Sequence, residues 1–161
     1  MAPGKSAQKR QYKLSDGTDL EEYRDKTIWS FGNKGLRHED VILIASLVPK
    51  VNVLALYLGG NKIVDISPLR DSIPNVQTLS LHHNQIVDIS PLRNSMPNMQ
   101  ELSLHHNQIV DINPILDHLG NLSMPNVQDL LLHWNKIDET TKDKFIAYWE
   151  LLDSEDDALT M

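Results

Sequence analysis

One phrase recurs four times along this chain and constrains its fold more than any other feature. Each copy reads Val/Met-x-x-Leu-x-Leu-x-x-Asn-x-Ile, and the copies occupy residues 53–63, 76–86, 99–109 and 127–137. The asparagines of the four copies are Asn61, Asn84, Asn107 and Asn135. Self-similarity in phase at a period of roughly 20–50 residues is typical of stacked repeats. The chain is therefore predicted to form a stack in which each copy contributes one strand.

The leucines of each copy predict a short strand, because successive side chains of a strand point to opposite faces. In the first copy, Leu56, Leu58 and Ile63 belong to the inward set. One repeat cannot bury its own apolar face, so the stacked copies share one continuous core. We expect the asparagines to point inward as well, where their amides bond to backbone groups that the turn leaves unpaired.

The segments between the strands predict helices of unequal length. Residues 35–48 lead into an amphipathic helix that Pro49 ends. The two central repeats leave room for about one helical turn each, with Ser67 and Ser90 as the expected N-caps. An insertion before Pro125 restores the longer spacing and predicts a longer helix in that repeat.

The two ends of the chain are less regular. Residues 27–33 alternate and end in Asn33, which precedes Asn61 by the same interval that separates Asn107 from Asn135, and this indicates a degenerate first strand. A final amphipathic helix over residues 140–152 is expected to cover the end of the stack with Phe145, Ile146, Trp149 and Leu152. We predict a flexible basic segment over 1–25, a repeat domain with both caps over 26–152, and an acidic tail over 153–161.

The repeated phrase resembles the leucine-rich repeat, and the resemblance covers residues 28–138. The central copies resemble the short repeats of bacterial internalins and of phosphatase-regulatory proteins, and the flanks resemble the ribonuclease-inhibitor type. The resemblance implies an α/β solenoid with about five parallel strands on its concave face and short helices or 3-10 turns on its convex face. It implies no single function, since such proteins include receptors, inhibitors, GTPase activators and scaffolds.

Composition and charge narrow the classes of partner. The chain has no cysteine, no apolar run long enough to span a membrane and no signal-like stretch at Met1–Ser6, so we expect a cytoplasmic location. The net charge is −7, and the segment 1–13 contains only basic charges, which leaves −11 on the remainder. An acidic body disfavours nucleic acid and anionic membrane as partners, because phosphate contacts need basic surface. We expect a monomer.

The residues that the repeat itself does not need form four rows on the concave face. Five of the seven histidines fall in two adjacent rows, where core packing has no use for them. The rows are Ala55, Thr78, Glu101 and Asp129; Tyr57, Ser80, Ser103 and Leu131; Gly59, His82, His105 and His133; and Gly60, His83, His106 and Trp134.

Three interpretations of the histidine rows stay open alongside recognition of a partner. A metal site is disfavoured because strands lie ~4.8 Å apart, which separates His82 from His133 by about 9.6 Å. Hydrolysis by Ser80 or Ser103 with a histidine base is disfavoured as well. It needs an oxyanion hole in a site that excludes water, which a shallow sheet does not provide by itself. Duplication of nearly identical units would copy the histidines without any function.

We therefore predict a protein-interaction module without catalytic residues, metal or cofactor. The alternative is a regulatory factor that acts on a partner enzyme such as a small GTPase or phosphatase. We expect the partner to present a basic patch and its affinity to vary between about pH 5.5 and 7.5, around the free imidazole pKa. The expected contact residues are Tyr57, His82, His83, Glu101, His105, His106, Asp129, His133 and Trp134.

Overall fold

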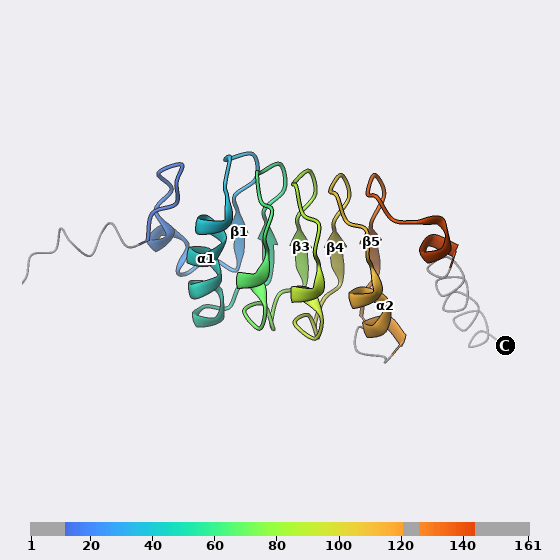
Figure 1. Ribbon diagram of the computed structural model, residues 1–161. Helices are drawn as coiled ribbons and strands as arrows, with labels where there is room; N and C mark the ends of the chain where they lie inside the picture. The colour runs from blue at the N-terminus through green and yellow to red at the C-terminus, as the bar shows by residue number, and fades with distance from the viewer. Residues whose placement is uncertain (1–11, 121–125, 144–161) are drawn as a thin grey trace, which may run out of the picture.

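The computed structural model describes residues 12–120 and 126–143 of the chain. Its five strands form one sheet, and Figure 1 shows the strands in one row with helices on one side of them. All neighbouring strands are parallel, and their order in the sheet is their order in the sequence. Each strand has three residues: β1 (Ile28–Ser30), β2 (Ala55–Tyr57), β3 (Thr78–Ser80), β4 (Glu101–Ser103) and β5 (Asp129–Leu131). The predicted solenoid fold with five parallel strands is confirmed.

The middle residue of each strand faces the core. Trp29, Leu56, Leu79 and Leu102 are in register and almost completely buried, whereas Leu130 in the last strand is only partly buried. Their neighbours on either side point to the opposite face, as strand geometry requires. One continuous hydrophobic core therefore runs through the stacked repeats.

Helices of unequal length form the other side of the stack, as the spacing predicts. These are α1 (His38–Leu47), η3 (Val48–Lys50), η4 (Ser67–Leu69), η5 (Ser90–Leu92) and α2 (Asn113–Gly120), and a further 3-10 helix, η2 (Leu20–Tyr23), lies in the N-terminal segment. Pro49 follows α1 as predicted, within η3. None of the helices among the described residues has the length and apolar character needed to cross a membrane.

The prediction that Ser67 and Ser90 are the N-caps of the central turns is wrong by one position. The 3-10 helices begin at Ser67 and Ser90 themselves, and neither serine caps its helix. Instead Asp65 accepts a hydrogen bond from the Ser67 N–H at 2.7 Å, and Asp88 accepts one from the Ser90 N–H at 2.8 Å. These N–H groups at the start of a helix have no partner within it, which explains why an aspartate recurs two positions before each turn.

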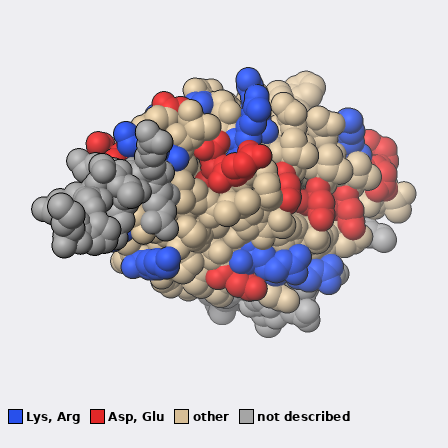
Figure 2. Space-filling view, turned by 60° about the vertical axis from the view of Figure 1, so that its left-hand side comes forward, with Lys and Arg blue, Asp and Glu red and all other residues tan. Residues whose placement is uncertain are grey.

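Figure 2 shows a row of acidic side chains on the surface, with basic side chains in a band beneath it. Asp65, Asp88 and Asp111 recur at the same place in three successive repeats and are exposed. Asp111 also accepts a hydrogen bond from a backbone N–H, that of Asn113, at 2.8 Å. The repeated aspartates therefore have a structural role, and their recurrence does not by itself indicate a binding site.

The repeated asparagines join each repeat to the one before it. The Asn84 side-chain NH₂ donates to Leu81 O in its own repeat and to Leu58 O in the preceding one, both at 3.0 Å. Its side-chain oxygen accepts from the Ile63 N–H at 3.0 Å. Asn107 repeats the arrangement, and both amides are buried. This confirms the structural role that we predict for the asparagines.

The first repeat differs from the others by one position. Ile28 pairs with Ala55, so Asn33 lies opposite Gly60 and not opposite Asn61 as its spacing suggested. The residue opposite Asn61 is Lys34, whose N–H donates to the Asn61 side-chain oxygen at 3.0 Å. Sequence spacing was misleading here because this unit has no asparagine at the inward position.

Packing begins earlier in the chain than residue 26, where we placed the start of the repeat domain. Leu14 and Leu20 belong to the core, and the Trp29 indole N–H donates to the backbone oxygens of Tyr23 and Lys26, each at 3.0 Å. The buried Asp40 carboxylate accepts hydrogen bonds from Ser15. The described part of the N-terminal segment, residues 12–25, therefore covers the first end of the stack.

The opposite end is described only as far as Asp143. Asp138 accepts hydrogen bonds from the N–H and the hydroxyl of Thr141, at 3.0 and 2.7 Å, and so caps the start of a helical turn. The expected capping residues Phe145, Ile146, Trp149 and Leu152, and the acidic tail over 153–161, lie outside the described residues, as do residues 1–11.

Candidate functional site

The strand register brings the predicted rows together on the face opposite the helices. Thr78, Glu101 and Asp129 are partners in one row, and Tyr57, Ser80, Ser103 and Leu131 are partners in the next. The other rows are connected by their ring contacts. The structure thus places every expected contact residue on one face.

Three histidines form what we call the inner histidine column: His82, His105 and His133. The His82 and His105 rings lie 4.9 Å apart between centroids with planes inclined by 3°. His105 and His133 lie 4.6 Å apart with planes inclined by 11°. These separations match the ~4.8 Å spacing of the strands, so each ring stacks on the ring of the neighbouring repeat.

Two serines hold rings of this column in place. Ser80 Oγ lies 2.7 Å from His82 Nδ1, and Ser103 Oγ lies 2.9 Å from His105 Nδ1. In each case the serine stands two positions before the histidine and shares its face of the strand. The hydrogen bonds fix the orientation of both imidazoles, so the inner histidine column is a preformed surface.

Gly59, which is absent from the expected contact residues, makes room for the column. A Cβ atom at this position would collide with the His82 ring, because it would lie closer to Cε1 than side chains approach one another. The His82 ring therefore lies directly over the backbone of the preceding repeat, and Gly59 is buried. The signal was present in the sequence, since glycine stands in the row that otherwise contains only histidine.

The outer ring column consists of His83, His106 and Trp134. The His83 and His106 rings stack at 4.0 Å, and His106 and Trp134 stack at 5.6 Å with planes inclined by 14°. All three residues have left-handed backbones, with φ of 51°, 55° and 59°. Gly60 occupies the same place in the preceding repeat with φ of 69°. Glycine adopts this conformation without strain and histidine tolerates it better than most residues, whereas a bulky residue such as Trp134 is rarely found there.

Several histidines of this face are harder to protonate than free imidazole. Burial, followed by repulsion from His82 and His133, lowers the pKa of His105 to about 4. Burial and the neighbouring His83 lower the pKa of His82, and desolvation and His83 lower that of His106. At neutral pH these three side chains are therefore uncharged ring surfaces that also carry polar nitrogens.

The geometry does not favour a metal site. Nitrogen lone pairs lie in the plane of an imidazole, and stacked parallel rings direct them side by side, so they do not converge on one ion. Within the described ranges, no group of three or more histidine, aspartate or glutamate side chains is arranged to hold a metal.

Hydrolysis meets one geometric requirement, because both serines are within hydrogen-bond reach of a histidine. The other requirements are not met. The Ser80 side chain is buried, and the lowered pKa of His105 makes its imidazole a weak base. Glu101 lies on the far side of Ser103 from His105, where a carboxylate cannot orient the imidazole.

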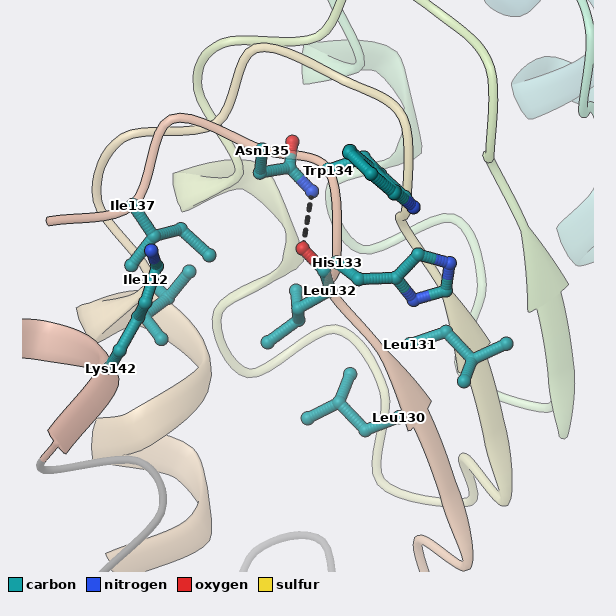
Figure 3. A pocket seen from close by; sticks show the side chains of 9 residues that line it. All are labelled: Ile112, Leu130, Leu131, Leu132, His133, Trp134, Asn135, Ile137 and Lys142. Carbon is teal, nitrogen blue, oxygen red and sulfur yellow. Dashed lines mark hydrogen bonds between the residues drawn. The ribbon is translucent and has the colours of Figure 1, made fainter. Parts of the chain in front are cut away.

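Two hollows adjoin these rows. The first, of about 480 Å³, lies over the middle of the sheet between the inner histidine column and the row of Thr78, Glu101 and Asp129. The second, of about 650 Å³, lies at the last repeat. Figure 3 shows it from close by, with Leu130 and Leu132 turned toward Ile112 and Ile137, and with Leu131, His133 and Trp134 on the other side of the strand.

Comparison with known proteins agrees with this architecture. The family model described as "Leucine Rich repeats (2 copies)" matches residues 51–94 and 74–119. Residues 51–119 of this chain are therefore leucine-rich repeats. No curated protein sequence matches it.

Two solved structures of Listeria monocytogenes proteins are similar to the fold. Internalin C2 is 35% identical over 62% of this chain and 39% of its own, with a TM-score of 0.52. The internalin inlF is 26% identical over 76% of this chain and 33% of its own, with a TM-score of 0.56. The present chain thus spans well under half the length of either internalin.

Proposed function

We propose that this protein binds a partner protein through its concave sheet face and has no catalytic activity of its own. The observation that carries the proposal is the outer ring column. His83, His106 and Trp134 occupy left-handed positions, and Gly60 at the equivalent place indicates that the fold requires no side chain there. Strained conformations of this kind cluster at binding sites, where a side chain is retained for its contacts.

Exposure of large side chains supports the same face. Trp134 is 71% exposed, Leu131 is 43% exposed and Tyr57 is 37% exposed. Aromatic residues of this kind are enriched among the anchors of protein interfaces. Stacking and the serine hydrogen bonds already order the rings, so binding loses little side-chain entropy.

The test compares variants of the two faces of the molecule. Wild-type protein, Trp134→Ala, His106→Ala and the convex variant Arg70→Ala are immobilised and exposed to an extract of the native cell. Any protein that the wild type retains is identified and its affinity for each variant measured. We expect Trp134→Ala to weaken binding by about 2 kcal/mol or more and Arg70→Ala to leave it unchanged. Binding that tolerates Trp134→Ala and His106→Ala but is lost with Arg70→Ala would move the site to the convex face.

We also propose a cytoplasmic location, with which the cysteine-free composition is compatible. Fractionation of the native cell, followed by detection of the protein in each fraction, tests this. Recovery in the culture medium or at the cell surface would contradict it.

A further inference from the structure

The hollow over the middle of the sheet has a floor of small side chains and higher ends. Ser80 and Ser103 form the floor, and Tyr57 and Leu131 stand at its two ends in the same row. His82 and His105 of the inner histidine column form one wall. These groups suit an elongated side chain that is apolar along its length, because the apolar side chain at one end of the hollow can cover its stem.

The opposite wall is acidic. Glu101 and Asp129 are register partners on adjacent strands, both are exposed and both line the hollow. The Thr78 hydroxyl is a weak hydrogen-bond donor to this wall, with its Oγ1 at 3.5 Å from Glu101 Oε2. Among the described residues, neither carboxylate forms an ion pair, and the four rows contain no lysine or arginine. Two neighbouring negative charges therefore face the hollow without a compensating cation in the part of the chain that the structure describes.

We propose that this hollow receives one arginine side chain of the partner, an assignment that rests on the proposed function of the face. The guanidinium group lies against Glu101 and Asp129, and its planar fork of donors can bond to both carboxylates. The methylene stem crosses the serine floor, and Leu131, two residues after Asp129 on the same face of β5, can cover it. Lysine fits less well, because its ammonium group is a more strongly hydrated point charge.

The inference is tested with small probes, so that no partner has to be known. N-acetyl-arginine amide is titrated into ¹⁵N-labelled protein, and amide chemical shifts are followed. N-acetyl-citrulline amide serves as the neutral isostere, and N-acetyl-lysine amide as the second cation. We expect the arginine probe to shift the amides of Ser80, Ser103 and Leu131 with saturation, and the citrulline probe to leave them unchanged.

Matched double variants establish which carboxylates are responsible. Glu101→Gln with Asp129→Asn should weaken the arginine probe by about tenfold or more, since two charge-assisted bonds are lost. Glu22→Gln with Asp25→Asn removes the same charges at exposed positions of the N-terminal segment and should leave the affinity within about twofold. Unchanged shifts elsewhere in the spectrum show that each variant is folded. The affinity of the arginine probe for the single variant Glu101→Gln gives a second measurement.

The assignment would be overturned by the absence of saturable shifts, by equal shifts with citrulline, or by an equally strong response to lysine. Shifts that map to the repeated aspartates Asp65, Asp88 and Asp111 in place of the hollow would also do so. These results are distinguishable from failure of the proposed function. If the hollow ignores arginine but Trp134→Ala still abolishes partner binding, the face binds protein without this contact.

Discussion

The repeated asparagines, here called the asparagine ladder, recur with the same period as the two ring columns. The two sets of residues recur for different reasons. Asn84 and Asn107 are buried, and each satisfies backbone groups in two repeats. His83 and His106 stand one position earlier and are exposed, on backbones that favour glycine. Recurrence alone therefore does not identify a functional residue. The distinction depends on whether the fold uses the side chain that recurs.

The largest expected effect tests this distinction directly. Asn84→Ala should lower the free energy of unfolding by about 1–3 kcal/mol, because the Ile63 N–H and the Leu58 and Leu81 carbonyls lose their buried partner. His83→Ala, the control at the adjacent residue, should change it by about 0.5 kcal/mol or less. Both values come from urea denaturation. Equal destabilisation by the two variants would remove the difference between the ladder and the column.

A second effect concerns pH and the inner histidine column. The unfolded chain takes up a proton near the ordinary imidazole pKa of 6.5, whereas folded His105 has a pKa of about 4. Stability should therefore fall as the pH decreases from 6.5 to 4, and this loss should be complete below 4. His105→Gln should flatten the profile in this window. A wild-type profile that is already flat between pH 6.5 and 4 would refute the prediction.

The Asp16 carboxylate acts outside this pH window and does not obscure it. Desolvation raises the pKa of Asp16, but hydrogen bonds from Lys34 and Thr18 outweigh it and lower the pKa from 3.8 to about 2. Its contribution to stability is complete above pH 3.8 and is lost as the pH falls through 2. Measurement between pH 4 and 6.5 therefore reports on the histidines.

A smaller effect isolates backbone strain in the outer ring column. His106→Ala and His106→Gly both remove the ring, but only glycine relieves the left-handed conformation at φ of 55°. We expect the glycine variant to be more stable than the alanine variant by about 1 kcal/mol. Thermal or urea unfolding of the pair measures this difference. Equal stabilities would mean that the position is not strained, which would weaken the case for a retained binding side chain.

The smallest effect sharpens the role of Gly59. Alanine there should displace the His82 ring and break its bond to Ser80, yet change the free energy of unfolding by about 1 kcal/mol or less. The readout is the NMR signal of the His82 ring, with Gly32→Ala as the control. A Cβ on Gly32 would have only Gly59 O nearby, at 3.4 Å. An unmoved His82 signal in Gly59→Ala would show that the ring does not rest on that backbone.

Most of the fold could be predicted because the repeat encodes it several times. Leu56, Leu79 and Leu102 give independent and consistent indications of the same strand, and the helix that Pro49 follows is predicted by ordinary helix signals. The one-position shift at Asn33 could not be predicted, since the first unit lacks the inward asparagine that sets the register elsewhere.

The candidate site was less predictable than the fold. Periodicity placed the histidines on one face, but the serine hydrogen bonds and the parallel stacking depend on side-chain rotamers that a pattern does not reveal. The expected change in affinity between about pH 5.5 and 7.5 used the pKa of free imidazole. Burial and neighbouring rings lower the pKa of His105 to about 4, so any effect of its charge belongs at lower pH.

The direction of the asparagine bonds makes the two ends of the stack unequal. The side-chain oxygen of each asparagine accepts from the preceding repeat: Asn84 from Ile63, Asn107 from Ile86 and Asn135 from Ile109. When a repeat detaches from the C-terminal end, an isoleucine N–H in the repeat that remains thus loses the asparagine oxygen that accepts its hydrogen bond. Detachment from the N-terminal end removes a carbonyl acceptor, and the Asn84 amide retains another in Leu81. Backbone bonds are lost at either end, for example Gln85 N–H to Ile63 O at the N-terminal end and Leu81 N–H to Ser103 O at the C-terminal end. The asparagine bonds are the asymmetric part of the stack, and any polarity of unravelling under mechanical load should come from them.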